Sequence, residues 1–176
     1  MTIHSEHPFL TPGEGRDPVR RLRGRTGGTV SLWTAGEGRD RAGLTVSSYL
    51  IAAGEPARAL ALLHPDADLL DRLVDTGRAV IHLLQWRDRE LAEVFAGLMP
   101  APGGPFRAGQ WDQTAWGPRL TGATTWAGVR LEAEGVAAPR EVGWSTLVEV
   151  VVEHVEVGED DSPLVHRRGR YERPRA

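Results

Sequence analysis

The sequence predicts a mainly β fold, a mostly antiparallel barrel with short helices. Six or seven candidate strands dominate the chain, and its two or three candidate helices do not alternate regularly with them, which argues against a parallel βαβ sheet. The chain has 176 residues, of which 40% are hydrophobic. This length suits one domain whose core needs neither a disulfide nor a metal ion.

The composition excludes several classes of protein. Cys is absent, which excludes disulfides, thiolate metal sites and a Cys nucleophile, and the expected location is the cytoplasm. The net charge of −3 offers no general basic surface for nucleic acid, and the apolar runs are too short to cross a membrane. The His residues lack metal-ligand spacing, so no metal site is predicted. All 21 basic residues are Arg, which indicates GC-rich coding.

The N-terminus is expected to be a flexible tail over residues 1–15, where Pro and Gly recur without periodicity. Residues 16–176 are then expected to form a single domain. Asp17 followed by Pro18 is typical of a helix start and predicts a short helix to about Arg23. The apolar residues of this helix, which are expected to face inward, are Val19 and Leu22.

Alternating or short apolar runs bounded by turn residues indicate the strands. The predicted strands are 29–34, 44–51, 57–63, 78–84, 120–133, 145–157 and 163–170. Residues 97–116 lack any pattern and are predicted to form a long loop. A loop of this length in a compact domain usually serves as a lid, a binding loop or a dimer arm.

Two further helices are predicted at 66–76 and 87–96, from apolar residues at helical spacing. In the first of them, Asp66 is the expected N-cap and Gly77 the expected end. Its apolar face is predicted to comprise Leu69, Leu70, Leu73 and Val74.

Five short motifs follow one another along the chain. They are Thr-Val-Ser-Leu-Trp-Thr at 29–34, Gly-Leu-Thr-Val-Ser-Ser-Tyr at 43–49, Val-Ile-His-Leu-Leu at 80–84 with Leu-Ala and Phe-Ala within 91–96, Trp-Gly-Pro-Arg-Leu at 116–120 with Gly-Ala at 122–123, and Pro-Leu with a Gly and a Tyr within 163–171. In this order they resemble the flavin reductase-like family over roughly residues 17–173. The resemblance implies an FMN-binding split β-barrel of antiparallel Greek-key type.

The same resemblance implies an FMN-binding oxidoreductase. NAD(P)H would reduce bound FMN, or FAD in its place, and the reduced flavin would serve a partner oxygenase or another acceptor. It also implies a homodimer with the flavin near the subunit interface. Partners are therefore expected to be the flavin, the nicotinamide nucleotide and a second copy of the chain, with no nucleic acid and no membrane.

By this resemblance, the flavin phosphate binds at a hydroxyl-rich strand. A phosphate needs several converging N–H and O–H donors. Thr45, Ser47 and Ser48 supply three hydroxyls, Val46 lies between them, and Arg41 adds a positive charge. On a straight strand, Thr45 and Ser47 point to one side and Ser48 to the other. Taken alone, the same residues are more typical of an ordinary strand that faces solvent, and it is the order of the surrounding motifs that favours a phosphate site.

The other candidate residues belong to the ring end of the flavin. Leu63 and His64 end a strand along which the family lays the isoalloxazine ring, where His64 is either a ring contact or an ordinary loop histidine. His82 replaces a flavin-contacting Asn of the family, and its alternative role is purely structural. Trp144 and Ser145 replace the family's Asp-His pair, which lies close to the flavin on the hydride-donor side.

The sequence is compatible with three functions. The first is an FMN-dependent reductase, which the ordered motifs favour. The second is a flavin- or haem-binding split barrel without reductase activity, which the residues at His82 and Trp144-Ser145 motivate. The third is a dimeric structural protein that keeps only the fold.

Overall fold

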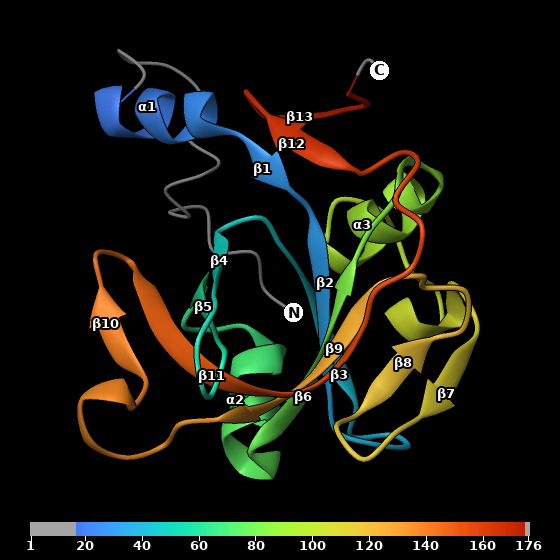
Figure 1. Ribbon diagram of the computed structural model, residues 1–176. Coiled ribbons are helices and arrows are strands. Elements are labelled where there is room, and N and C mark those ends of the chain that lie inside the picture. Colours follow the sequence, from blue (N-terminus) through green and yellow to red (C-terminus); the bar gives the residue numbers. More distant parts are fainter. Residues whose placement is uncertain (1–16, 175–176) are drawn as a thin grey trace.

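A computed structural model describes residues 17–174, and its strands form three sheets (Figure 1). The tail expected at 1–15 lies outside the described residues. The helices and 3-10 turns are α1 (Pro18–Thr26), α2 (Asp68–Thr76), η1 (Trp86–Asp88), α3 (Arg89–Phe95), η2 (Pro105–Arg107) and η3 (Gly135–Ala137). The strands are β1 (Gly28–Thr29), β2 (Ser31–Ala35), β3 (Ala42–Val46), β4 (Tyr49–Ala52), β5 (Arg58–Leu63), β6 (Arg78–Leu83), β7 (Trp111–Gln113), β8 (Pro118–Leu120), β9 (Trp126–Leu131), β10 (Arg140–Val142), β11 (Ser145–Glu156), β12 (Val165–Arg167) and β13 (Arg170–Glu172). None of these helices is long and apolar enough to span a bilayer.

The main sheet has eight antiparallel strands and curls into a barrel. Its order is β3-β2-β6-β9-β11-β5-β4, with β10 paired to β11. The two end strands, β3 and β4, are consecutive in the chain, and only Ser47 and Ser48 separate them. The chain itself therefore closes the barrel at these two serines, which we call the seam. The prediction of a mainly β antiparallel barrel is confirmed, but the strand predicted at 44–51 is two strands.

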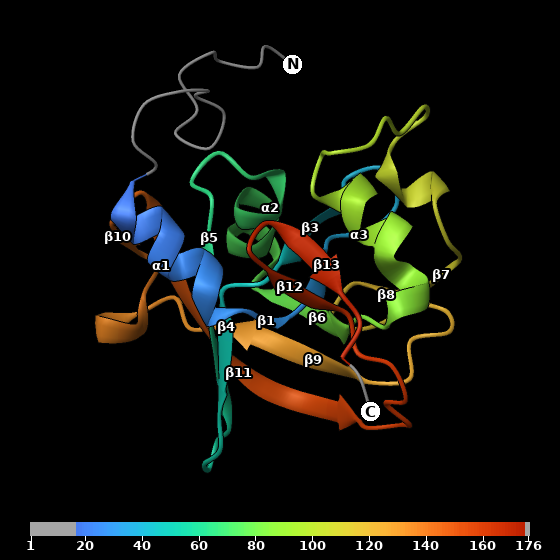
Figure 2. The ribbon, with the colours of Figure 1, turned by 90° about the horizontal axis from the view of Figure 1, so that it is seen from above.

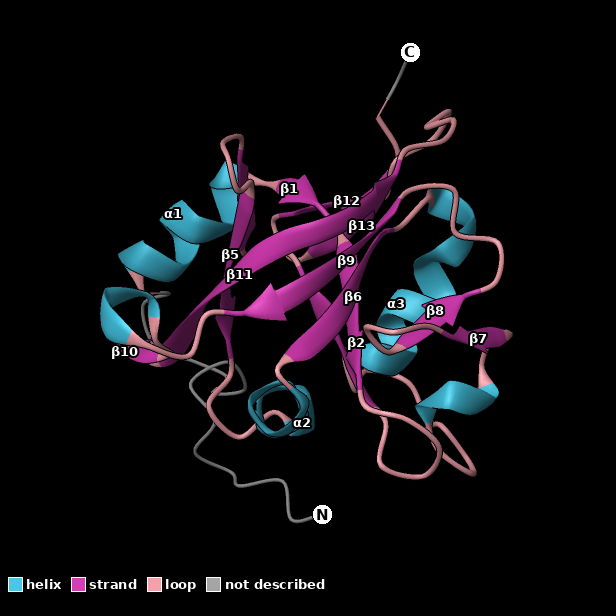
Figure 3. Cartoon of the chain, turned by 60° about the horizontal axis from the view of Figure 1, so that its bottom comes forward, coloured by secondary structure: helices cyan, strands magenta, loops and turns pink. Residues whose placement is uncertain are grey.

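Two hydrophobic cores meet at strand β2, which is buried along its whole length. Trp33 points into the core inside the barrel, and Leu32 into a second core under α3. Figure 3 shows α2 against one end of the curled sheet and α3 on another side of it. Because each face of β2 lies in a different core, the alternation in its sequence separates two buried faces rather than a buried face from an exposed one.

Helix α1 begins at the predicted residue, since the Asp17 carboxylate accepts a hydrogen bond from the Val19 N–H at 2.9 Å. The expectation that its apolar residues face inward is wrong. Val19 and Leu22 are 69% and 65% exposed. The helix lies at one end of the molecule, where its main neighbour is β12, and it has no sheet face to cover (Figure 2).

Helix α2 departs from its predicted start. Its N-cap is Ala67, and Asp66 does not cap it; instead the Asp66 N–H donates to Nδ1 of His64 at 3.1 Å. Three leucines of the predicted face are buried, but Val74 is 54% exposed, so its assignment to that face is wrong. Gly77 ends the helix with a φ of 67°, as predicted. The helix predicted at 87–96 is present as η1 followed by α3.

Residues 97–116 are more ordered than the predicted loop. They contain η2 and β7, and β7 pairs with β8. Phe106 and Trp111 pack edge-on against each other and against Phe95 of α3, with ring centroids 4.9 to 5.6 Å apart. These aromatic contacts hold the middle of the segment against the second core.

Two other strand predictions need correction. Residues 121–125 form turns, so the strand predicted at 120–133 is reduced to β9. The strand predicted at 163–170 is a hairpin of β12 and β13 that reverses at Arg168 and Gly169, whose φ angles are 53° and 78°. The sequence does not predict β10, because its three exposed residues show no apolar alternation and become a strand only by pairing with β11.

Gly128 of β9 is a position where the barrel tolerates no side chain. A Cβ built there would lie 2.2 Å from Cδ2 of Trp116, whose indole covers the strand. We expect Gly128→Ala to displace this indole and to lower the free energy of unfolding by about 1–3 kcal/mol. Urea denaturation measures the loss. Gly24→Ala is the matched control, since a Cβ there has no neighbour closer than 3.7 Å, and helical Ala is favoured over Gly. Equal stability of both variants would contradict the prediction.

Candidate functional site

The seam presents two hydroxyl groups that the fold does not use. Ser47 is exposed and Ser48 is half-buried, and neither hydroxyl has a hydrogen-bond partner among residues 17–174. The backbone beneath them is fixed, because the Ser48 carbonyl accepts a hydrogen bond from the Leu62 N–H of β5 at 2.9 Å. At the seam, the backbone is therefore fixed by a hydrogen bond, while the two serine hydroxyls are free to bind a ligand.

Buried hydrogen bonds hold the strand that leads into the seam. Trp33 donates from Nε1 to the Ser31 hydroxyl at 3.0 Å, and Ser31 donates in turn to the carbonyl of Val46 at 2.8 Å. On the far side of the seam, the hydroxyls of Tyr49 and Thr29 share a hydrogen bond of 2.6 Å. Both flanks of the serine pair are therefore tied to β1 and β2, and Val46 contributes its backbone while its side chain is buried.

Sequence reasoning did not select Tyr49 and Thr29 as site residues. They lie 20 positions apart, and only the pairing of the folded chain brings their hydroxyls together. Burial raises the pKa of the Tyr49 phenol, so this hydroxyl remains protonated and available as a donor at neutral pH. No local pattern in the sequence indicates the contact.

The end of β5 lies directly beside the seam. Leu63 pairs with Thr146 of β11 and buries its side chain completely in the barrel core. His64 follows it and is half-buried, and the Nδ1 atom accepts the Asp66 N–H. Since Leu62 is bonded to Ser48, the structure brings the predicted residues Ser47, Ser48, Leu63 and His64 to one end of the barrel.

The turn between β10 and β11 completes this end of the molecule. It contains Trp144, whose indole is 73% exposed, and it leads into Ser145 at the start of β11. Because β5 lies between the seam and β11, this turn is two strand spacings across the sheet from the serines and three residues along the chain from Leu147, which pairs with Leu62. An exposed aromatic surface and the 39% exposed Leu62 therefore lie on the same side of the serines as His64.

Two predicted residues do not join this group. The Thr45 hydroxyl donates to the Ala92 carbonyl of α3 at 2.7 Å, so it is used by the fold. Arg41 precedes β3 and places its guanidinium 4.4 Å from the ring centroid of Phe106. It is about 20 Å from Ser47 along the extended chain. Ser47 lies beyond the last residue of β3, Val46, so Thr45 and Ser47 do not belong to one continuous strand.

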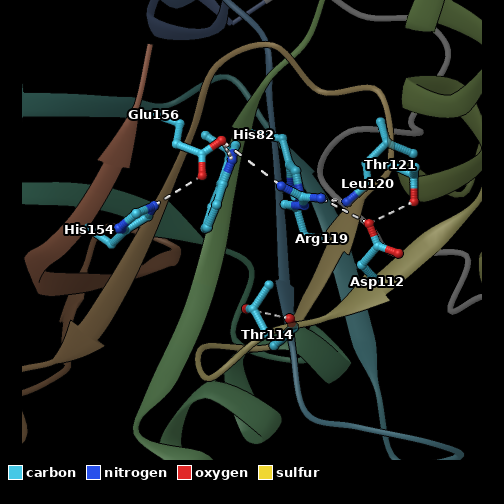
Figure 4. A network of polar contacts seen from close by, with 10 residues as sticks. His82, Asp112, Thr114, Arg119, Leu120, Thr121, His154 and Glu156 are labelled. Atoms are coloured by element: carbon cyan, nitrogen blue, oxygen red, sulfur yellow. Dashed lines mark hydrogen bonds and ion pairs between the residues drawn. The ribbon is translucent and has the colours of Figure 1, made fainter. Parts of the chain in front are cut away.

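His82 lies in the interior, where it joins three strands. The ring is fully buried; Nδ1 donates to the Leu32 carbonyl at 2.9 Å, and Nε2 accepts the Leu120 N–H at 3.0 Å (Figure 4). This arrangement requires the neutral ring, and burial lowers the pKa of His82 to about 4. A direct contact with a ligand would require the ring to give up one of these hydrogen bonds.

A second polar network covers the outer face of β9 and β11, away from the seam. His154 stacks on Trp116 with ring centroids 5.2 Å apart, and it lies 3.4 Å from the Glu156 carboxylate. Arg119 bridges Glu156 and Asp112 (Figure 4). The hydrogen bond from Trp126 is the main cause of the lowered pKa of Glu156. The carboxylates of this network all have partners within the chain, whereas Nε of Arg119 is buried without a hydrogen-bond partner.

The curled antiparallel sheet and its seam can now be compared with known proteins. The flavin reductase like domain model matches the chain over residues 23–175. The chain therefore belongs to the flavin reductase-like family. A comparison with curated protein sequences finds no match.

Solved structures show the same fold. The NADH:FAD oxidoreductase of Streptomyces globisporus superposes with a TM-score of 0.77 at 22% identity, covering 94% of this chain and 100% of that one. The styrene monooxygenase flavin reductase of Pseudomonas putida gives 0.77 at 20% identity, covering 91% and 99%. A flavin reductase domain protein from Arthrobacter gives 0.77 at 21% identity, covering 90% and 94%. The split-barrel prediction is confirmed.

Membership of this family makes the chain an oxidoreductase that uses a flavin and a nicotinamide nucleotide. The residues at the seam fit a flavin nucleotide. Its phosphate needs hydroxyl and N–H donors, which Ser47 and Ser48 have free, and its ring needs a flat apolar surface. Leu62 and Trp144 expose such surface on one side of the serines.

Proposed function

We propose that this protein is a flavin reductase that binds its flavin nucleotide across the seam end of the barrel. The phosphate accepts hydrogen bonds from Ser47 and Ser48, and the ring lies toward His64 and the Trp144 turn. The observation that carries this proposal is the pair of serine hydroxyls without partners at the point where the barrel closes.

A bound flavin supplies the redox chemistry, taking a hydride from a reduced nicotinamide nucleotide and passing electrons to an acceptor. The chain's own residues bind the flavin and orient it. The serine hydroxyls donate to the phosphate, and the hydrogen bond from Leu62 to Ser48 keeps the seam backbone from shifting. The apolar side chains of Leu62 and Trp144 exclude water from the ring.

Several finer features belong to the same proposal. The cofactor is FMN or FAD, the electron donor is NADH or NADPH, and the reduced flavin serves a partner oxygenase in the cytoplasm. One solved neighbour is a monooxygenase flavin reductase by name, which supports the oxygenase partner. We further propose a homodimer. Leu50 and Ile51 of the edge strand β4 are 72% and 59% exposed, which suits a surface covered by a second copy.

The test is flavin binding and turnover by the purified protein. We expect Ser47→Ala combined with Ser48→Ala to weaken flavin binding by about 100-fold or more, because two hydrogen bonds to a charged phosphate are lost. Flavin fluorescence quenching gives the Kd, and absorbance at 340 nm follows oxidation of NADH or NADPH. Ser162→Ala is the matched control, since that hydroxyl is buried without a partner and is not at the seam.

Two outcomes would contradict parts of this proposal. Unchanged flavin affinity in the double variant would show that the phosphate does not bind at the seam. Tight flavin binding without oxidation of either nucleotide would instead favour the second candidate, a flavin-binding barrel without reductase activity. The exposed Trp144 favours that candidate, because its indole stands at the ring end, where the family has an Asp-His pair and a nicotinamide must approach.

A further inference from the structure

Exposed arginines gather at one end of the molecule, although the chain carries a net charge of −3. We call this group the arginine surface; its members, which form no ion pair with any other residue of 17–174, are Arg21, Arg25, Arg167, Arg168 and Arg170. Elsewhere, by contrast, Arg58 and Arg130 each bind two carboxylates. The neighbouring acids in 17–26 and 165–172 are Asp17, which caps α1, and Glu172.

The arginine surface is formed by two segments that are distant in the sequence. The Arg168 N–H donates to the Gly24 carbonyl at 2.7 Å, and the Arg167 side chain lies 3.3 Å from where a Cβ of Gly27 would be. Figures 1 and 2 both show α1 and β12 at the same end of the molecule. Contacts between α1 and the β12–β13 hairpin thus bring the arginines of both segments together on one surface.

Two glycines separate this surface from the seam. Gly27 lies against Arg167, and a Cβ at Gly28 would be 3.6 Å from the Ser47 carbonyl oxygen. Gly27 and Gly28 are half-buried, and their backbone connects the arginine surface to the backbone of Ser47. The Ser48 carbonyl accepts the Leu62 N–H of β5, so the seam lies between the glycines that lead to the arginine surface and β5.

The serine pair thus lies between two surfaces of different chemistry. The apolar side with Leu62 and Trp144 suits a flavin ring, and the basic side suits a second phosphate and a base. FMN ends at the phosphate on the serines, whereas FAD continues with another phosphate and an adenosine. Guanidinium groups bind phosphate in bidentate fashion and stack on aromatic bases.

Resting on the function proposed above, we propose that the arginine surface binds the second phosphate and the adenosine of FAD. Arg25 and Arg167 are the members closest in sequence or in space to Gly27 and Gly28, and they determine a preference for FAD over FMN. A distant exposed arginine, Arg39 in the turn between β2 and β3, has no part in this preference.

The test compares FAD and FMN binding by fluorescence quenching in the full chain. We expect the wild type to bind FAD at least about 10-fold more tightly than FMN, and Arg25→Ala with Arg167→Ala to remove most of that difference while leaving the FMN Kd within about twofold. Arg39→Ala is the matched control and should leave both Kd values unchanged. Circular dichroism and the Tm establish that the variants are folded.

Other results would overturn the inference. Equal affinity of the wild type for FAD and FMN would do so, as would a double arginine variant that retains the preference. A rise in the KM for NADPH, without a change in the FAD Kd, would assign the arginine surface to the nicotinamide nucleotide instead. In each of these cases the serine variants still weaken flavin binding, so the seam proposal survives; if the serine variants have no effect either, the proposed function itself fails.

Discussion

Acidification from pH 6.5 to pH 4 is expected to lower the free energy of unfolding by about 3 kcal/mol through His82 alone. The pKa of the buried ring is about 4 in the folded chain, against an ordinary value of 6.5. Between these values the unfolded chain binds a proton that the folded chain excludes, so stability falls as the pH falls. The difference of about 2.5 between the two pKa values, at about 1.4 kcal/mol for each, is worth about 3.5 kcal/mol in total. Most of this stability is lost by pH 4, and the remainder is lost below it.

The variant His82→Asn separates this effect from general acid denaturation. Asn has no proton to gain, so the difference in stability between wild type and variant should shrink as the pH falls from 6.5 to 4. At pH 7 the variant should be less stable by about 1–3 kcal/mol, because the shorter side chain cannot reach both the Leu32 carbonyl and the Leu120 N–H. Urea denaturation at pH steps measures both quantities. If the free energies of unfolding of the two proteins changed in parallel with pH, His82 would be excluded as the source of the loss at low pH.

The barrel could be predicted from the sequence because its strands carry strong apolar patterns, as in 57–63 and 145–157. Their ends could not be predicted where the deciding interaction is distant. The chain bends at Ser47 and Ser48 because β3 pairs with β2 and β4 with β5, and the local sequence reads as one strand. Likewise, the chain reverses at Arg168 and Gly169, although the local sequence pattern predicts that the strand continues.

The residues of the candidate site, too, could be predicted from the sequence only in part. Ser47 and Ser48 could be selected because they lie in one of the ordered motifs, and Leu63 and His64 because the family resemblance places the flavin ring at the end of their strand; the structure brings the four together. Thr45 belongs to the same motif, but its hydroxyl is satisfied by Ala92, a residue 47 positions away. The role of His82 depends on two backbone groups from other strands, which spacing alone does not reveal. Burial and hydrogen-bond partners are properties of the folded chain.

Trp33→Ala is expected to lower the free energy of unfolding by about 3–5 kcal/mol. Trp33 is completely buried in the barrel core, and truncation leaves a cavity among closely packed side chains. Its Nε1 also donates to Ser31, which holds the Val46 carbonyl next to the seam. We therefore expect flavin affinity to fall along with stability.

Two further variants separate these contributions. Trp33→Phe keeps most of the ring but loses the Nε1 hydrogen bond, and it should cost about 1–3 kcal/mol, because the Ser31 hydroxyl loses a buried partner. Trp144→Ala makes the same chemical change as Trp33→Ala at a side chain that is 73% exposed, and its stability should stay within about 0.5 kcal/mol of wild type. Urea denaturation of the three variants compares them directly. If Trp144→Ala lowers the free energy of unfolding as much as Trp33→Ala, burial in the barrel core does not explain the contribution of Trp33 to stability. The proposed connection between Trp33 and flavin binding at the seam would then also be wrong.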